Sequence, residues 1–161
     1  MQLRPERPSG FTIIELLIAI VILVILLGLA VPSMNGVFAD RRLRRSLDAF
    51  NAIVREAQER SVTERRPYLV IWQNGKIGLR AEGLNKGESP DPEVKWKLER
   101  SESLKIKFPA ALVEDPPAEW IFWSSGNCEP AEVTYRGKDG AWTSKYSALT
   151  GQSEIVAYAT K

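Results

Sequence analysis

The pattern of hydrophobic and polar positions begins with a long apolar run. No charged residue occurs from Leu16 to Val31. Residues 11–31, taken as a helix, would be about 32 Å long, which matches the roughly 30 Å hydrocarbon thickness of a bilayer. Because a helix satisfies its own backbone hydrogen bonds in lipid, the run predicts one membrane-spanning helix. A buried helix of a soluble protein is the alternative, but this run is apolar on every face.

The segment after the apolar run is amphipathic. Its apolar residues recur at spacings of four, three, four and three, which places them on one face of a helix. Pro67 prevents a helix from extending past about residue 66. The pattern therefore predicts that the helix continues and lies against a globular head. The apolar face consists of Leu43, Leu47, Phe50, Val54 and Ala57.

After Pro67 the hydrophobic period changes from helical to extended. Asn74-Gly75 lies between two strand-like runs and is a strong signal for a hairpin turn. Further strand-like runs reach the C-terminus, separated by loops at 82–93 and 109–119 that are rich in Pro and Gly. One helix followed by consecutive strands predicts an α+β fold, with the helix laid on an antiparallel sheet. The expected strands are 68–72, 76–80, 94–98, 104–108, 120–123, 132–136, 141–146 and 154–158.

Composition excludes several kinds of active and metal site. The chain has no His, which removes His-ligated metal centres and mechanisms that use imidazole as a base. Its single cysteine, Cys128, allows neither an internal disulfide nor a thiolate zinc cage. The formal net charge of +2 does not by itself indicate a polyanion partner. We expect a head that is not an enzyme, with no metal and no cofactor, and with most of its five Trp side chains in the core.

The start of the apolar run is compatible with three fates. The first is a plain signal anchor. The second is a cleaved secretory signal, since residues 28–30 form a small-x-small triplet, although the run is longer than the usual h-region. The third fate depends on Glu15, a carboxylate five residues after Gly10 and inside the start of the run. A charge at mid-bilayer costs roughly 2.5–3.5 kcal/mol and less near an interface, so a residue of this kind indicates a function.

The residues around Glu15 resemble a known processing signal. Residues 10–17, Gly-Phe-Thr-Ile-Ile-Glu-Leu-Leu, are similar to the class III signal of type IV pilins and type II secretion pseudopilins. The resemblance implies that a prepilin peptidase cuts between Gly10 and Phe11 and N-methylates Phe11. It also implies that Glu15 pairs with the terminal amine of a neighbouring subunit, which relieves the desolvation cost of both charges in lipid. Pro32 resembles the proline that kinks the helix in this family.

The same resemblance divides the chain into four parts. It implies that residues 1–10 are a prepilin leader and that residues 11–32 are the transmembrane and filament-core half of the helix. Residues 33–66 would then be the amphipathic half of the helix, and residues 67–161 would be an antiparallel β head. The chain is then expected in the bacterial inner membrane, single-pass, with its head in the periplasm. Charge counting disagrees, because four arginines follow the span and two precede it, and the positive-inside rule would keep the head in the cytoplasm. We follow the family orientation.

The head resembles the GspH/FimT minor pseudopilins. Residues 120–126, Trp-Ile-Phe-Trp-Ser-Ser-Gly, are similar to a family strand that leads into a Gly-containing turn. Trp142, followed by Leu-Thr-Gly at 149–151, is similar to the closing segment, although Ser147-Ala148 replaces the usual Asp-Pro. The resemblance implies a minor pseudopilin, a structural subunit of the periplasmic pseudopilus of a type II secretion system. Its expected partners are other minor pseudopilins, the major pseudopilin, the prepilin peptidase and the inner-membrane assembly platform.

A second function fits the same family, namely a FimT-like minor type IV pilin that binds DNA for uptake in natural transformation. The resemblance would give this role to basic residues near the C-terminus. Carboxylates are interspersed among those residues, whereas phosphate contacts need accumulated positive charge. The sequence therefore favours secretion over DNA uptake. The candidate DNA-binding residues are Arg136, Lys138, Lys145 and Lys161.

Overall fold

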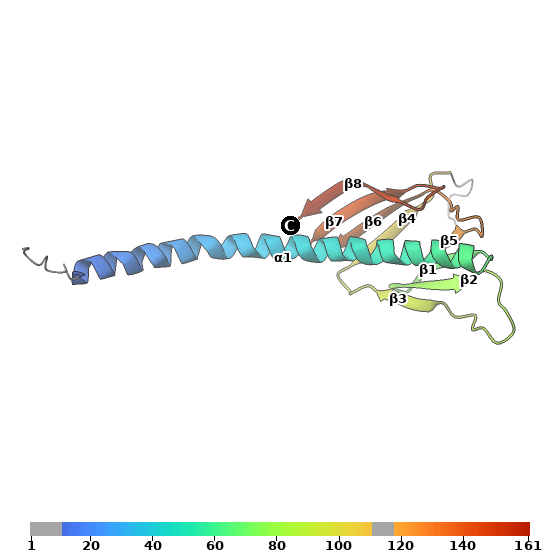
Figure 1. Ribbon diagram of the computed structural model, residues 1–161, viewed down its shortest axis with the longest axis horizontal. Coiled ribbons are helices and arrows are strands. Elements are labelled where there is room, and N and C mark those ends of the chain that lie inside the picture. The colour runs from blue at the N-terminus through green and yellow to red at the C-terminus, as the bar shows by residue number, and fades with distance from the viewer. Residues whose placement is uncertain (1–10, 111–117) are drawn as a thin grey trace, which may run out of the picture. The chain divides into compact units, whose positions relative to one another are not determined.

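The computed structural model describes residues 11–110 and 118–161, and within these it leaves the side chains of residues 29–35 undescribed. The described residues form one helix followed by strands in two antiparallel sheets (Figure 1). The chain divides into two compact units, Met1–Val37 and Phe38–Lys161. The expected α+β fold, a long N-terminal helix and an antiparallel head, is confirmed.

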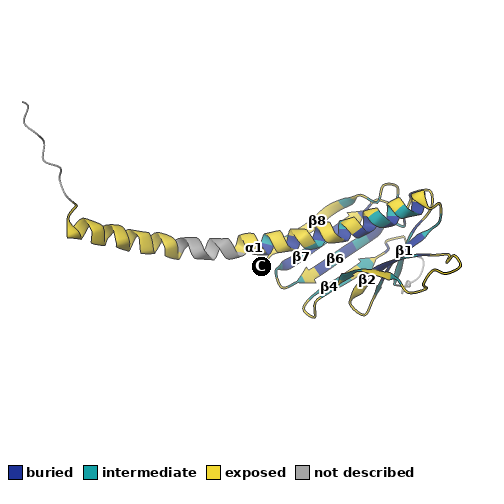
Figure 2. Cartoon of the chain, turned by 60° about the horizontal axis from the view of Figure 1, so that its bottom comes forward, coloured by how far each residue is buried: buried dark blue, intermediate teal, exposed yellow. Residues whose placement is uncertain are grey.

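Helix α1 (Ile13–Thr63) carries both the apolar run and the amphipathic pattern. The five apolar residues of the predicted stripe are all buried, and the opposite face is exposed (Figure 2). The helix ends where the backbone of Arg65 turns to a positive φ of 52°, just before Pro67. The limit that Pro67 sets on the helix is therefore confirmed.

Three expectations about the N-terminal part lie partly or wholly outside the described residues. Among the helical residues with described side chains, no helix is both long enough and apolar enough to cross a membrane. The expected span, residues 11–32, continues into residues 29–35, and so includes Pro32, whose side chain is not described. The expected leader, residues 1–10 with Gly10, is also outside the described part. The span, the kink and the leader stay predictions.

Eight strands follow α1 in the described residues, each within two residues of an expected run. Asn74 and Gly75, both with positive φ, form the predicted tight hairpin turn. The expected loop 109–119 falls mostly on residues 111–117, outside the described part. The strands are β1 (Tyr68–Gln73), β2 (Lys76–Ala81), β3 (Glu93–Lys97), β4 (Ser103–Lys107), β5 (Glu119–Phe122), β6 (Ala131–Gly137), β7 (Gly140–Tyr146) and β8 (Ser153–Thr160).

The strands form two sheets, whereas the alternation pattern led us to expect one. The first sheet has the order β3-β2-β1-β5 and the second the order β4-β6-β7-β8. The chain leaves the first sheet after β3, returns to it with β5, and stays in the second from β6 onward. Alternation shows which side chains of a strand are buried, but it does not show which strand lies beside it. The division into two sheets therefore depends on long-range packing.

Aromatic side chains join both sheets and α1 in one core. Phe50 of α1 packs against Trp142 and Tyr146 of the second sheet, with ring centroids 6.0 and 5.8 Å apart. Trp120 of the first sheet packs edge-on against the same Tyr146 at 5.2 Å. Trp120 and Trp142 are fully buried, Trp72 and Trp96 are partly buried against the core, and Trp123 is 40% exposed. The expectation that most Trp side chains lie in the core is confirmed.

Cys128 is a buried thiol. Its sulfur donates to the carbonyl oxygen of Ser147 at 3.4 Å, and burial raises the pKa of the thiol to about 11. Since the ordinary value is 9.0, the folded chain should hold about 100-fold less thiolate at pH 8 than the unfolded chain. Iodoacetamide should therefore label Cys128 at least that much more slowly before denaturation than after it, as measured by intact mass. Equal labelling rates would contradict the buried position.

Candidate assembly site

The start of α1 is fixed by Thr12. The Oγ1 atom of Thr12 accepts a hydrogen bond from the backbone N–H of Glu15 at 3.3 Å. The carbonyl oxygen of Thr12 accepts from the N–H groups of Glu15 and Leu16 at 3.1 and 3.3 Å. Thr12 is therefore the N-cap, and the helix begins at Ile13. The Thr-x-x-Glu spacing is the sequence signal of such a cap, and it was not used in the sequence analysis.

Glu15 lies in the first turn of α1, where the positive end of the helix dipole favours a carboxylate. The backbone N–H of Glu15 donates to the capping residue Thr12. Among the described residues, no hydrogen bond or ion pair involves the side chain of Glu15. The carboxylate is exposed within this chain. It is therefore available to a cation outside the described residues.

The apolar side chains around Glu15 are also uncovered. Their exposed fractions run from 49% at Val21 to 87% at Ile13, which is typical of side chains that no other described residue covers. An apolar surface of this size needs lipid or other protein around it, because soluble monomers rarely expose one. The residues are Phe11, Ile13, Ile14, Leu16, Leu17, Ile18, Ile20, Val21, Ile22, Leu23, Val24, Ile25, Leu26 and Leu27.

Two of the four arginines that follow the apolar run are bound within the head unit. Arg42 donates to both carboxylate oxygens of Asp139, at 2.9 and 2.6 Å, and the guanidinium holds the pKa of that carboxyl below its ordinary value. Arg44 donates to Asp40 at 2.9 Å and lies over the ring of Tyr158 at 5.6 Å. Through these contacts, the part of α1 that contains Arg42 and Arg44 is attached to β8 and to the turn between β6 and β7.

Lys145, one of the candidate DNA-binding residues, lies between carboxylates. On the outward face of the second sheet, its position in β7 lies opposite Glu132 of β6 on one side and opposite Glu154 of β8 on the other. Glu132 in turn lies opposite Lys107 of β4. Charges of alternating sign therefore cross all four strands in one row, named here the charge row: Lys107, Glu132, Lys145 and Glu154. This row has no surplus of positive charge for a phosphate backbone.

The other candidate DNA-binding residues lie toward the opposite end of β7. Arg136 is exposed, and the ammonium of Lys138 lies 3.9 Å from a carboxylate oxygen of Glu99. The N–H of Lys161 donates to the carbonyl oxygen of Asp139 at 3.0 Å, which brings Lys161 to the same end. The structure therefore brings Arg136, Lys138 and Lys161 to one end of the sheet and leaves Lys145 at the other.

Two lysines outside the predicted DNA-binding set share a surface hollow with Arg136. Lys105 and Lys107 of β4 line, with Arg136, a shallow hollow of about 360 Å³ on the outward face of the sheet. They are brought there by the pairing of β4 with β6, which sets Ser103 opposite Arg136. Alternation along β4 could have placed both lysines on one face, but not next to β6.

Comparison with known proteins gives two sequence matches. The family described as the prokaryotic N-terminal methylation motif matches residues 7–31. The type II secretion system protein H of Aeromonas hydrophila is 27% identical over 141 residues, which cover 85% of this chain and 70% of that protein.

Solved structures share the fold. The minor pseudopilin EpsH from the type 2 secretion system of Vibrio cholerae has a TM-score of 0.53 at 13% identity, over 74% of this chain and 96% of that one. The type IV minor pilin FimU of Pseudomonas aeruginosa has a TM-score of 0.51 at 20% identity, over 74% of this chain and 92% of that one. These likenesses show that the fold is shared, and the motif and the sequence relative point to pseudopilins.

The chain is similar to the GspH/FimT-like pseudopilins.

The methylation motif contains the residues expected to matter for processing and assembly. Gly10, Phe11 and Glu15 all lie within the matched segment, and Pro32 follows it directly. The described residues hold no cluster of three or more Cys, Asp or Glu side chains that could bind a metal ion. What the described part of the site offers is an exposed apolar helix with a carboxylate in its first turn, which suits assembly with other helices.

Proposed function

We propose that this pseudopilin is a structural subunit of the periplasmic pseudopilus of a type II secretion system and supports protein export. The observation that carries the proposal is the start of α1, where Glu15 lacks a partner among the described residues and the apolar side chains around it are uncovered. Its sequence relative, the secretion system protein H, supports secretion as the context. The head then contributes surface to the filament, and the helix contributes to its core.

Before assembly, the same apolar side chains anchor the chain in the inner membrane, with the head in the periplasm. The prepilin peptidase removes residues 1–10 by cutting between Gly10 and Phe11, and methylates the new amine of Phe11. Thr12 supports this step, because its capping bonds hold the start of the helix directly behind Phe11. The inner-membrane assembly platform and the other minor and major pseudopilins are the remaining partners.

Intact-mass measurement tests the processing step. The chain extracted from membranes of cells with an active prepilin peptidase should begin at Phe11 and carry one methyl group. Gly10→Val should leave the leader in place, because the bulkier side chain obstructs the peptidase. A mature chain that begins at residue 31 would indicate ordinary signal-peptide cleavage and would overturn the proposal.

Replacing Glu15 with valine tests the assembly step. The variant should insert into the membrane and be processed as before, because valine suits the apolar run better than glutamate does. It should enter filaments at least tenfold less, since the terminal amine of the neighbouring subunit would lose its charge partner in an apolar environment. The measurement is the ratio of filament-bound to membrane-bound chain in sheared cells.

Glu15→Asp is the matched control, because it keeps the charge in the same turn of the helix. It should recover part of the assembly that Glu15→Val loses. Normal assembly of Glu15→Val would remove Glu15 from the mechanism, and failure of Glu15→Val to be processed would assign it to the peptidase instead.

A DNA titration separates secretion from the uptake function. In a gel-shift experiment at low salt, the full-length chain in detergent should not shift duplex DNA, because Glu132 and Glu154 flank Lys145 and the remaining candidate residues are few. A shift that disappears steeply with added salt, and that is lost in a variant with Lys105, Lys107 and Arg136 all changed to glutamine, would favour DNA uptake.

A further inference from the structure

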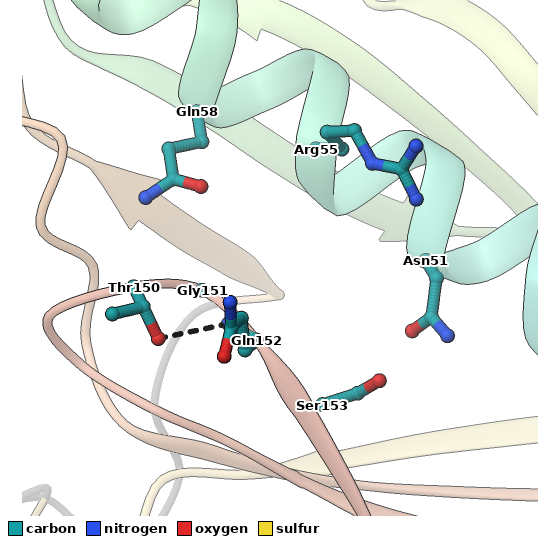
Figure 3. A pocket seen from close by; sticks show the side chains of 7 residues that line it. All are labelled: Asn51, Arg55, Gln58, Thr150, Gly151, Gln152 and Ser153. Carbon is teal, nitrogen blue, oxygen red and sulfur yellow. Dashed lines mark hydrogen bonds between the residues drawn. The ribbon is translucent and has the colours of Figure 1, made fainter.

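A polar cleft lies between α1 and the turn that connects β7 to β8. It encloses about 390 Å³ and lies wholly within the unit Phe38–Lys161. In Figure 3 the side chains of Asn51 and Gln58 point from α1 toward the turn, and the guanidinium of Arg55 lies between them in this view. The lining residues are Asn51, Arg55, Gln58, Thr150, Gly151, Gln152 and Ser153.

Hydrogen bonds hold the walls of the cleft in place. Gln58 donates from its Nε2 atom to the carbonyl oxygen of Gly126 at 2.8 Å, which fixes the helix side. On the turn side, Gly151 has a φ of +61° and donates to the carbonyl oxygen of Ser147 at 2.9 Å. A Cβ atom at Gly151 would lie 3.1 Å from the side-chain oxygen of Gln58, so the close approach of turn and helix suits glycine. The cleft is thus formed before any ligand enters.

Two side chains that line the cleft, Asn51 and Thr150, have hydrogen-bond donors that remain free, while the side-chain oxygen of Gln58, an acceptor, faces Gly151. The Oδ1 atom of Asn51 accepts from the hydroxyl of Tyr146 at 2.7 Å, which leaves the NH₂ group of Asn51 to donate. Burial raises the pKa of Tyr146, so its hydroxyl keeps the proton that fixes this orientation. The hydroxyl oxygen of Thr150 accepts from the N–H of Gln152 at 3.3 Å, so the hydroxyl proton of Thr150 is also free to donate.

Arg55 gives the cleft a positive charge. Its side chain is exposed, and within the described part of the chain it has no ion-pair partner. Among the described residues no Asp or Glu lines the cleft. A guanidinium in a cleft that also holds amide and hydroxyl donors suits a carboxylate, which it can bind through two parallel N–H bonds.

The neighbouring strand indicates how such a carboxylate could be presented. Ser153 lines the cleft and is also the first residue of β8, which lies at the edge of the second sheet. Ile155 and Val156, two and three residues further on, are 52% and 54% exposed. An edge strand with exposed apolar side chains can receive an extended segment of another chain through backbone hydrogen bonds.

We propose that the cleft binds a glutamate or aspartate side chain of an extended protein segment, which pairs with the free edge of β8. Arg55 and the amide of Asn51 receive the carboxylate, while Ile155 and Val156 contact the rest of the segment. This inference goes beyond the filament role, and it concerns a surface of the head that does not include Glu15.

Peptide titration tests the inference on the unassembled full-length chain in zwitterionic detergent micelles. The probes are a blocked pentapeptide of threonine and valine with one central glutamate, the same peptide with glutamine, and glutarate. The glutamate peptide should bind at least tenfold more tightly than the glutamine peptide or glutarate. In ¹⁵N-labelled protein it should shift the side-chain signals of Asn51 and Arg55 together with the backbone amides of residues 153–156.

Arg55→Gln should remove the preference for glutamate, and Arg45→Gln should not. Arg45 is the matched control, because it is exposed on the same helix and does not line the cleft. Equal binding of both peptides would overturn the carboxylate site, and equal binding of glutarate and the glutamate peptide would overturn the role of β8. Since no step requires a filament, the result is independent of the Glu15 experiment.

Discussion

Replacing Phe50 with alanine should lower the free energy of unfolding of the head by about 3–5 kcal/mol, the usual cost of a large cavity in a well-packed core. Phe50 is fully buried and is the residue of α1 that contacts both Trp142 and Tyr146. Its loss would therefore weaken the attachment of the helix to the second sheet as well as leave a cavity. Urea unfolding of the full-length chain in detergent, followed by Trp fluorescence, measures the change.

Phe38→Ala is the matched control for Phe50→Ala. Phe38 lies on the same helix in the same unit, but it is 46% exposed. Its truncation should cost less than about 1 kcal/mol, since most surface substitutions change stability little. Similar losses for the two variants would show that the helix does not use the predicted stripe to contact the sheets.

Replacing Gly140 with alanine should have an effect of similar size for a different reason. Gly140 opens β7 with a φ of +146°, a conformation that side chains other than glycine rarely adopt and that costs about 1–3 kcal/mol. A Cβ atom built there would lie 2.1 Å from the carbonyl oxygen of Ala159 and 2.9 Å from the Cδ2 atom of Leu43. Either β8 or α1 would have to move, so we expect a total loss of about 3 kcal/mol or more.

Hydrogen exchange can show where the strain of Gly140→Ala is released. Residue 140 pairs with Thr160, so amides near the end of β8 should lose protection first. Gly83→Ala is the control, because a Cβ atom there meets nothing within 4 Å. A Gly140→Ala protein as stable as the Gly83→Ala protein would contradict the close contact between β7 and β8.

Local patterns were sufficient to predict the elements of the fold. Period-2 alternation or short runs of β-branched and aromatic residues located the strands of the described head, Asn74-Gly75 located the first hairpin, and Pro67 set the limit of the helix. The apolar stripe from Leu43 to Ala57 identified the buried face of α1. These features depend on residues that are close together in the sequence, so the sequence alone contains them.

Features that depend on distant residues could not be predicted in this way. The separation of β3 from β4 into different sheets follows from which strands pair, and pairing is decided by packing across the whole head. For the same reason, the sequence did not show that Glu132 and Glu154 flank Lys145, and Lys145 was therefore selected as a candidate DNA-binding residue. The cleft that contains Arg55 could not be predicted either, because its two walls are about a hundred residues apart in the chain.

The buried thiol has a practical consequence for spectroscopy. Cys128 is the chain's single cysteine, and its burial protects it from alkylating reagents. A second cysteine introduced at an exposed position such as Leu149 would therefore accept a fluorophore or spin label selectively, while the native sulfur stays unmodified. Distances between labelled heads could then be measured in intact filaments without first removing Cys128 from the core.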